Sequence, residues 1–325
     1  MPLEQVKTQA WRHVGFALLL TLALAGVRYA ASSSDGLDKI EQFEMSSGTD
    51  VGPDVAFFGA GLHGDAAIFT IIGLDPLGGD LGQRLNEPAY RYQRFGYSWT
   101  ALGLTGGADG LILLGLSLIG LASAAGMAYL ASTLNEPLGW RSWLLIANPA
   151  VLLGVINDTA EPLALLMMIL ALSATVPLLR VASGVAVAVV RPSYLVALFG
   201  RWWVFVPALV VAVAAKVAWS LRFGDSVLSG SIAVDLPFLG ILENPSLLGW
   251  LVTLAGLATA LVGVWKRDWG WMAGGLFVLV FSAGVFHTPT NAVRAAGYLP
   301  VLWAFGPNWK PSRATTQVSH VVDDH

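Results

Sequence analysis

Ionisable side chains stand in several short clusters inside an otherwise apolar chain, and the first cluster offers a general base. His63 and Asp65 are followed by Asp75, ten residues after Asp65. A carboxylate held at a membrane surface, where water is partly excluded, can take the proton of an acceptor hydroxyl. Asp65 is therefore the candidate base, with His63 as a helper. The alternatives are a helix cap at Asp65 for residues 66–74 and a plain surface position for His63.

The second cluster, residues 88–94 (PAYRYQR), offers an anion site. Arg91 and Arg94 are three residues apart and share a face if this segment is helical. Two guanidinium groups side by side match a phosphate or diphosphate better than lysines would. The alternative is anchoring at the headgroup level, where Tyr and Arg are common. Three neighbours of these arginines are candidate supporting residues, namely Tyr90, Tyr92 and Gln93.

Charged residues also interrupt the later apolar runs. Asp158 and Glu161 have the spacing of a capping box at the start of a helix, which is the alternative to a functional role. Arg191 stands at the apex between two very short apolar runs, and an arginine there needs an anion. Arg294 is a further basic residue expected at the outer face of the membrane, and Lys216 is expected near it. We expect Arg191 and Arg294 to bind phosphate with Arg91 and Arg94.

Several kinds of functional site are excluded by the sequence or have no motif in it. The chain has no cysteine and no phosphate-binding loop, and its net charge of -3 gives no basis for nucleic-acid binding. No ligand spacing predicts a metal site, and a divalent cation beside Asp65 and the neighbouring acids stays open as a cofactor.

The composition indicates a membrane protein. Of 325 residues, 55% are apolar and only 12% are charged, and the mean hydropathy is +0.66. A soluble domain has roughly twice that charged fraction. We therefore expect an all-α polytopic protein embedded in the lipid bilayer, in which long apolar runs cross the membrane as helices.

A single integral membrane domain is predicted for residues 1–306, with about ten crossings. Residues 11–31 form the first span, for which a cleavable signal peptide is the alternative. Residues 32–94 form an external loop, which holds ten acids against four bases and interfacial helices. Residues 95–306 hold the other spans, beginning with a partial helix at 95–104. Two short spans flank Arg191 and Pro192, and the remaining apolar runs cover residues 109–134, 143–156, 162–179, 202–221, 247–265, 269–286 and 295–306.

The distribution of basic residues predicts the orientation. With the amino terminus inside, nine of 18 bases but only five of 21 acids face the cytoplasm, as the positive-inside rule expects. The carboxyl terminus, with a polar tail at 307–325, is then cytoplasmic as well. The candidate site faces the other side of the inner cell membrane, and the bases after the first span that are assigned to the cytoplasmic side are Arg141, Arg180, Arg201, Lys266, Arg267, Lys310 and Arg313.

Two segments resemble a known family. The run GDAAIFTIIGLDP, followed by EPAYRYQRFGYSWTALGL, resembles the signature of small hydrophobic bacterial proteins linked to cell-surface glycopolymer formation. Those proteins read close to YDGQFYYRLALDP and PAYRYQRILYPLLA, and they belong with the GT-C superfamily of membrane glycosyltransferases. Residues 148–172, 185–195 and 291–304 are also similar to later parts of the family. The chain departs from the family at Asp65-Ala66-Ala67, where the family has DGQ followed by aromatic residues.

The resemblance implies a function. A GT-C enzyme transfers a sugar from a polyprenyl-phosphate donor to an extracytoplasmic glycan or lipid acceptor, with an external aspartate as base and inversion at the anomeric carbon. Aligning the LDP triplets puts Asp65 at the position of that base. The alternatives are a transporter or flippase of lipid-linked sugars and a non-catalytic scaffold in glycopolymer assembly.

Overall fold

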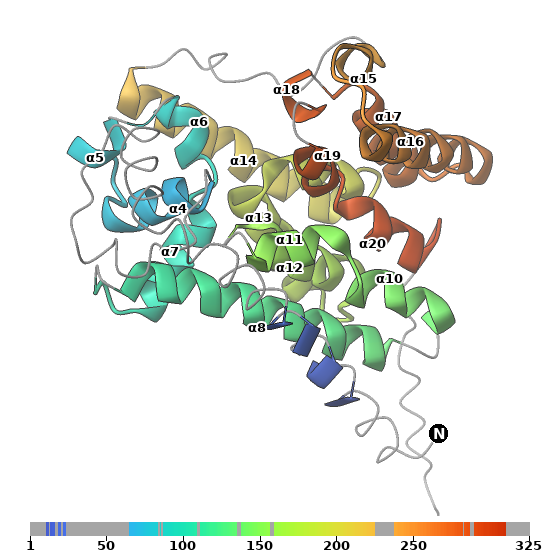
Figure 1. Ribbon diagram of the computed structural model, residues 1–325, viewed down its shortest axis with the longest axis horizontal. Helices are drawn as coiled ribbons and strands as arrows, with labels where there is room; N and C mark the ends of the chain where they lie inside the picture. Colours follow the sequence, from blue (N-terminus) through green and yellow to red (C-terminus); the bar gives the residue numbers. More distant parts are fainter. Residues whose placement is uncertain are drawn as a thin grey trace, which may run out of the picture.

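The chain folds into helices throughout its described part. The computed structural model describes residues 65–83, 85, 87–108, 111–134, 138–156, 159–224, 237–281, 283–286 and 289–309, together with isolated positions between 11 and 23. Among these residues there are α-helices and short 3-10 helices and no β-strand. The all-α expectation is confirmed for this part of the chain (Figure 1).

Four helical segments are long and apolar enough to cross a membrane, and they match four of the predicted runs. They are α8 (Ile112–Thr133), the segment Gly139–Ile156, α14 (Trp202–Phe223) and α16 (Leu247–Lys266). Gly139–Ile156 contains η3 (Gly139–Ser142), α10 (Trp143–Ile146) and α11 (Pro149–Ile156). These helices support a membrane protein, and the count of about ten crossings stays a prediction.

The prediction of one span at 162–179 is wrong, because the helix is interrupted at residues 174–176. Helix α12 (Glu161–Ser173) has 13 residues, and three residues separate its end from the start of α13 (Pro177–Val190). Val176 is extended, with φ −78° and ψ 118°. The ring of a proline disfavours the helical conformation in the residue before it, so Pro177 ends one helix and starts the next.

The turn at Arg191 is confirmed, but the two elements beside it differ from the prediction. Helix α13 has 14 residues, starts at Pro177, well before the turn, and ends at Val190, with Arg191 as its C-cap. The second element, η4 (Pro192–Leu198), is a 3-10 helix of seven residues. At 1.5 Å per residue, α13 is about 21 Å long. It is shorter than the roughly 30 Å of a hydrocarbon core.

The amino-terminal helices form one group beside the end of α13 (Figure 1). They are α4 (Asp65–Leu74), α5 (Asp80–Gln83), α6 (Pro88–Tyr92) and α7 (Phe95–Leu104). The ten-residue partial helix expected at 95–104 is confirmed. Helix α7 packs against α4, α8 and α13, and α6 packs against α14.

The carboxyl-terminal helices are shorter than the predicted runs at 269–286 and 295–306. Helix α17 (Trp269–Leu279) ends before Val280, and α20 (Tyr298–Phe305) begins after Gly297. Between them lie α18 (Ala283–Phe286) and α19 (Pro289–Ala295), with α15 (Leu239–Glu243) beside α18. Helices α16 and α17 pack along each other as a close pair (Figure 1).

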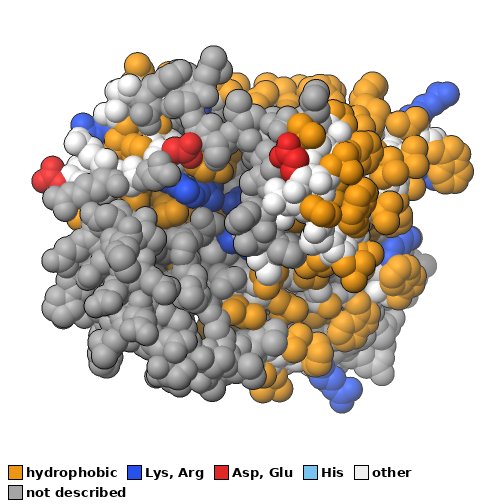
Figure 2. Space-filling model, turned by 45° about the horizontal axis from the view of Figure 1, so that its top comes forward, with side chains coloured by type: hydrophobic (Ala, Val, Ile, Leu, Met, Phe, Trp, Pro, Cys, Tyr) orange, Lys and Arg blue, Asp and Glu red, His pale blue; other side chains and the backbone are white. Residues whose placement is uncertain are grey.

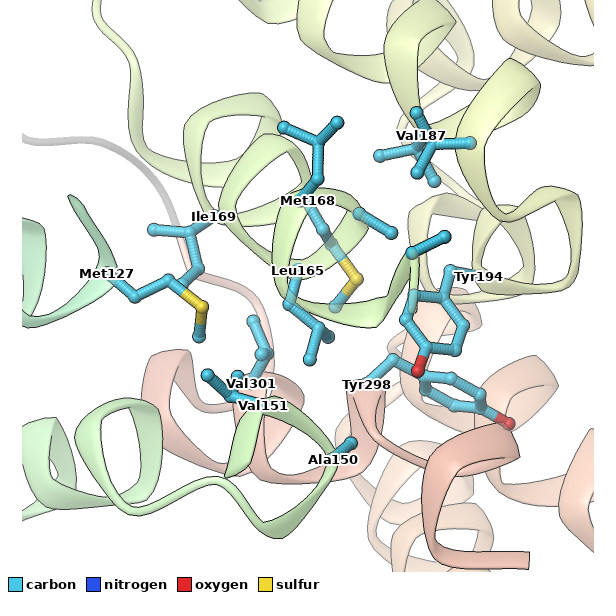
Figure 3. Close-up of a cluster of buried hydrophobic side chains, with 14 of the residues drawn as sticks. Met127, Ala150, Val151, Leu165, Met168, Ile169, Val187, Tyr194, Tyr298 and Val301 are labelled. Atoms are coloured by element: carbon cyan, nitrogen blue, oxygen red, sulfur yellow. The ribbon is translucent and has the colours of Figure 1, made fainter. Parts of the chain in front are cut away.

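The core lies where five elements meet around α12. Figure 3 shows Leu165 and Met168 of α12 among side chains from α8, α11, α13, η4 and α20. All of the labelled side chains are buried. Dense packing of this kind holds the ends of α12 and α13 in fixed positions. The labelled residues are Met127, Ala150, Val151, Leu165, Met168, Ile169, Val187, Tyr194, Tyr298 and Val301.

The contact between α16 and α17 depends on glycine. A Cβ atom on Gly275 would lie 2.3 Å from the backbone nitrogen of Ala260 and 2.5 Å from the carbonyl oxygen of Gly256. We predict that Gly275→Ala lowers the melting temperature, with a loss of about 1–3 kcal/mol from overpacking. Gly103→Ala is the control, because a Cβ there meets nothing within 4 Å. Equal melting temperatures for the two variants would contradict the packing argument.

Candidate functional site

One buried carboxylate joins three distant segments of the chain. Glu161 is fully buried at the start of α12. Its Oε1 atom accepts a hydrogen bond from Arg294 Nε at 3.1 Å and lies 3.0 Å from Arg294 Nη2. The same oxygen lies 3.3 Å from Arg191 Nη2. The structure thus brings together three of the predicted site residues, which we call the Glu161 cluster: Glu161, Arg191 and Arg294.

The capping-box interpretation of Glu161 is wrong. Helix α12 begins at Glu161, and Ala160 is its N-cap, without a side-chain hydrogen bond. A capping box needs the glutamate at the third helical position, so Glu161 is placed too early for it. Its carboxylate binds the two arginines instead. Asp158, the other residue of the predicted box, lies outside the described residues.

Two buried tyrosines, for which the sequence predicted no role, lie beside the arginines: Tyr194 contacts both of them, and Tyr298 packs against Tyr194. The hydroxyl of Tyr194 donates a hydrogen bond to the carbonyl oxygen of Arg294. Its ring lies 5.9 Å from the guanidinium carbon of Arg191 and packs edge-on against Tyr298, with 5.5 Å between ring centroids. The Tyr298 hydroxyl in turn donates to the carbonyl oxygen of Gly274. Tyr194 follows Arg191 by three residues, and this spacing was the one sequence signal for its role.

The Glu161 cluster gathers two cations in largely buried surroundings. Two guanidinium groups share one carboxylate oxygen, and the arginine side chains are only 14% and 11% exposed. Among the described residues, the buried Nε of Arg191 has no hydrogen-bond partner. A charge removed from water is stabilised only by an opposite charge or by hydrogen bonds. An anion such as phosphate supplies both.

A second group of cations lies on α6 and the turn into α7. Helix α6 ends at Tyr92, so Arg94 lies beyond it as the N-cap of α7. The two arginines nevertheless converge on one ring, because the guanidinium carbons of Arg91 and Arg94 lie 5.5 and 5.2 Å from the centroid of Tyr90. Arg94 is buried and also lies 5.4 Å from the ring of Phe69 on α4.

The two arginine groups are neighbours. The Tyr90 phenol acts electrostatically on Arg191, so α6 lies within reach of the Glu161 cluster. A Cβ atom on Gly96 would lie 3.1 Å from the carbonyl carbon and oxygen of Val189, two residues before Arg191. The start of α7 therefore packs directly on the end of α13. Figure 2 shows Lys and Arg side chains near the middle of one face, where acidic side chains lie close by.

Asp75 and Tyr92 build the loop that carries α6. The carboxylate of Asp75 accepts hydrogen bonds from the backbone N–H groups of Gly79 and Gly82, at 2.8 and 2.9 Å. Tyr92 donates its hydroxyl to the carbonyl oxygen of Asp75. Burial, followed by the Asp75 carboxylate, raises the pKa of the Tyr92 phenol, so this donor stays neutral. Asp75 and Tyr92 thus have structural partners.

Gln93 and Lys216 lie next to this group on different elements. Gln93 is the C-cap of α6. Lys216 is in α14, one turn before Trp219, whose ring lies 4.8 Å from that of Tyr92. Residues three apart on a helix share a face, so the register puts Lys216 on the face of α14 that packs against α6.

The position of the candidate base is described only in part. Asp65 is the first residue of α4, one turn before Phe69. The side chain of Asp65 and the whole of His63 lie outside the described residues. Within the described ranges, no group of three or more His, Cys, Asp and Glu residues could hold a metal ion.

No protein-family model, curated protein or solved structure matches this chain. The chemistry of the site therefore comes from its own residues. These are two largely buried arginines that share one carboxylate and a second pair of arginines beside them.

The shared carboxylate has a measurable effect on stability. Glu161→Gln keeps the shape of the side chain but removes the negative charge that two largely buried guanidinium groups share. Removal of one partner of a buried ion pair costs about 3–5 kcal/mol, so we predict a clear fall in melting temperature. The control is Glu243→Gln, because Glu243 is exposed at the end of α15. A melting temperature equal to that of the control would contradict the role of Glu161.

Proposed function

We propose that the protein is a membrane glycosyltransferase of GT-C type. It transfers a sugar from a polyprenyl-phosphate donor to an extracytoplasmic glycan or lipid acceptor. The observation that carries the proposal is the Glu161 cluster, in which two largely buried arginines from distant segments share one carboxylate oxygen. A phosphate that leaves a sugar develops negative charge, and fixed positive groups stabilise that charge in the transition state.

The short helices favour a lipid-linked donor. The Glu161 cluster lies at the ends of α12 and α13, which have 13 and 14 residues. Such helices span only part of a hydrocarbon core, so headgroup and lipid tail can both approach the arginines from the membrane. Arg91 and Arg94, joined to the cluster through Tyr90, extend the basic surface for the donor phosphate.

Asp65 is the proposed catalytic base. The acceptor hydroxyl oxygen forms a bond to the anomeric carbon, and the bond from that carbon to the phosphate oxygen breaks. The hydroxyl proton passes to the Asp65 carboxylate, and polyprenyl phosphate leaves with the bonding electron pair. Helix register supports this role, because Asp65 precedes Phe69 by one turn and the ring of Phe69 is covered by Arg94.

The resemblance supports the same assignment. The residues that carry it, GDAAIFTIIGLDP and EPAYRYQRFGYSWTALGL, form α4, α6 and α7 next to the Glu161 cluster. The later similar segments contain Glu161, Arg191 and Arg294. By this resemblance the sugar is transferred with inversion, the site faces the extracytoplasmic side, and both ends of the chain are cytoplasmic. The ten-crossing topology belongs to the same proposal.

Reconstitution separates this function from its two alternatives. The full chain in vesicles is supplied with a polyprenyl-phosphate sugar that carries a labelled sugar. Labelled product identifies a transferase, whereas movement of the donor between leaflets without product identifies a flippase. Neither outcome in the presence of a competent acceptor extract identifies a scaffold and overturns the enzyme proposal.

The base assignment predicts a specific loss of transfer. Asp65→Asn should lower the transfer rate by a factor on the order of 10² to 10⁴, because the amide cannot take the acceptor proton. Asp80→Asn is the matched control, since Asp80 is an exposed carboxylate on the neighbouring helix α5. Expression and helix content should be unchanged in both variants. A transfer rate for Asp65→Asn equal to that of Asp80→Asn removes Asp65 from the role.

The arginine pair on α6 and α7 is tested by donor affinity. Arg91→Gln and Arg94→Gln should each weaken donor binding by roughly tenfold, the effect of a lost charge-assisted hydrogen bond. Arg222→Gln serves as the control, because this exposed arginine bonds the carbonyl oxygen of Leu77 through its Nε. Donor affinity like that of the control in both variants would return the pair to membrane anchoring.

A further inference from the structure

A second basic group lies at the opposite end of α12 and α13 from the Glu161 cluster. Arg180 is in the first turn of α13, and its Nε donates to the carbonyl oxygen of Ala171 near the end of α12. Arg180 and Arg191 are eleven residues apart, so the two basic groups are separated by about 16 Å along the helix. The two groups are therefore distinct.

Two tight turns bring Arg180 and Arg201 to one acidic residue. A Cβ atom on Gly200, whose φ is +87°, would lie 2.9 Å from the Cβ atom of Trp269. The turn before α14 is thus pressed against the turn between α16 and α17. Asp268 and Arg180 both act electrostatically on Arg201, so the two residues lie near the Arg201 guanidinium group.

Asp268 is already engaged with the backbone. Its two oxygens accept hydrogen bonds from the N–H groups of Trp271, at 3.0 Å, and Asn308, at 2.6 Å. It caps α17 and fastens the segment after α20. One carboxylate used in this way balances one positive charge at most, and no other acidic residue of the described part lies in these turns.

Three more basic residues belong to the same region. Lys266 and Arg267 are exposed in the turn that contains Asp268, and the carbonyl oxygen of Lys266 accepts a hydrogen bond from Asn308. Gly306 lies two residues before Asn308, and a Cβ atom on it would lie 2.8 Å from Nη1 of Arg141. Five basic residues thus belong to the turns that meet at Asp268.

Exposed tryptophans mark the same end of the helices. Trp140 is 75% exposed, Trp203 is 89% exposed and Trp265 is 74% exposed. Exposed indole rings collect at the headgroup level of a membrane, where one side of the ring is apolar and the N–H is hydrated. Binding of a free phosphate ion would not require these exposed indole rings. The exposed tryptophans next to the basic residues are Trp140, Trp143, Trp202, Trp203, Trp265 and Trp269.

We propose that this end of the protein, which we call the Asp268 end, binds the anionic headgroup of a phospholipid. Arg180 and Arg201 contact the phosphate, Arg141, Lys266 and Arg267 surround it, and the tryptophan rings lie among the neighbouring lipid headgroups. An anionic leaflet attracts each basic residue near its surface and so favours this orientation of the protein in the bilayer. The site does not depend on sugar transfer.

Lipid binding to the detergent-solubilised full chain tests the proposal. Native mass spectrometry compares binding of dioleoylphosphatidylglycerol with that of dioleoylphosphatidylcholine. We expect the wild type to prefer phosphatidylglycerol, and the double variant Arg180→Gln/Arg201→Gln to lose about fivefold in affinity for each basic residue removed. Arg222→Gln, an exposed arginine in the last turn of α14, is the control and should keep the preference.

Three outcomes overturn the proposal. These are an unchanged preference in the double variant, an equal loss in Arg222→Gln, and equal thermal stabilisation of the wild type by inorganic phosphate and by phosphatidylglycerol. Because Arg201 is partly buried, its variant is first checked for wild-type helix content and elution volume. If it fails this check, the exposed pair Lys266→Gln/Arg267→Gln decides, and an unchanged preference there rejects the site.

Discussion

The carboxylate of Glu161 is the interaction on which the rest of the site depends. It binds Arg191 and Arg294 through a single oxygen, and so it fixes three segments that are up to 133 residues apart in sequence. A buried carboxylate needs cationic partners to offset its desolvation. The interaction that holds these helices together therefore also brings two guanidinium groups to one place, and the proposed phosphate site is built on them.

Two groups of basic residues lie at opposite ends of α12 and α13. One end has the Glu161 cluster and the arginines beside Tyr90, and the other has the Asp268 end with its exposed tryptophans. Three described acids have defined partners: Glu161 binds arginines, while Asp75 and Asp268 accept backbone hydrogen bonds. We propose a phosphate at each end, the first from a substrate and the second from the surrounding lipid.

The sequence predicts the long helices of this fold better than the positions where helices end. Apolar runs were enough to predict α8, α14 and α16, because a long apolar helix leaves a continuous signal. The end of α12 escaped prediction because residues 162–179 stay apolar across the break and Pro177 alone marks it. The type and position of Arg191 and Arg294 indicated an anion site. Their shared partner could not be predicted, since the spacing of Glu161 also fits a capping box and a contact over 133 residues leaves no local pattern.

Phosphorus NMR of a short-chain polyprenyl phosphate tests the central claim most directly. The ligand is titrated into lipid nanodiscs that hold the full chain or its double variant Arg191→Gln/Arg294→Gln. A phosphate bound between guanidinium groups has a different chemical shift from the free phosphate, so we expect a saturable shift with the wild type and none with the double variant. An identical titration curve for a folded double variant would contradict the account, because the phosphate would then bind elsewhere.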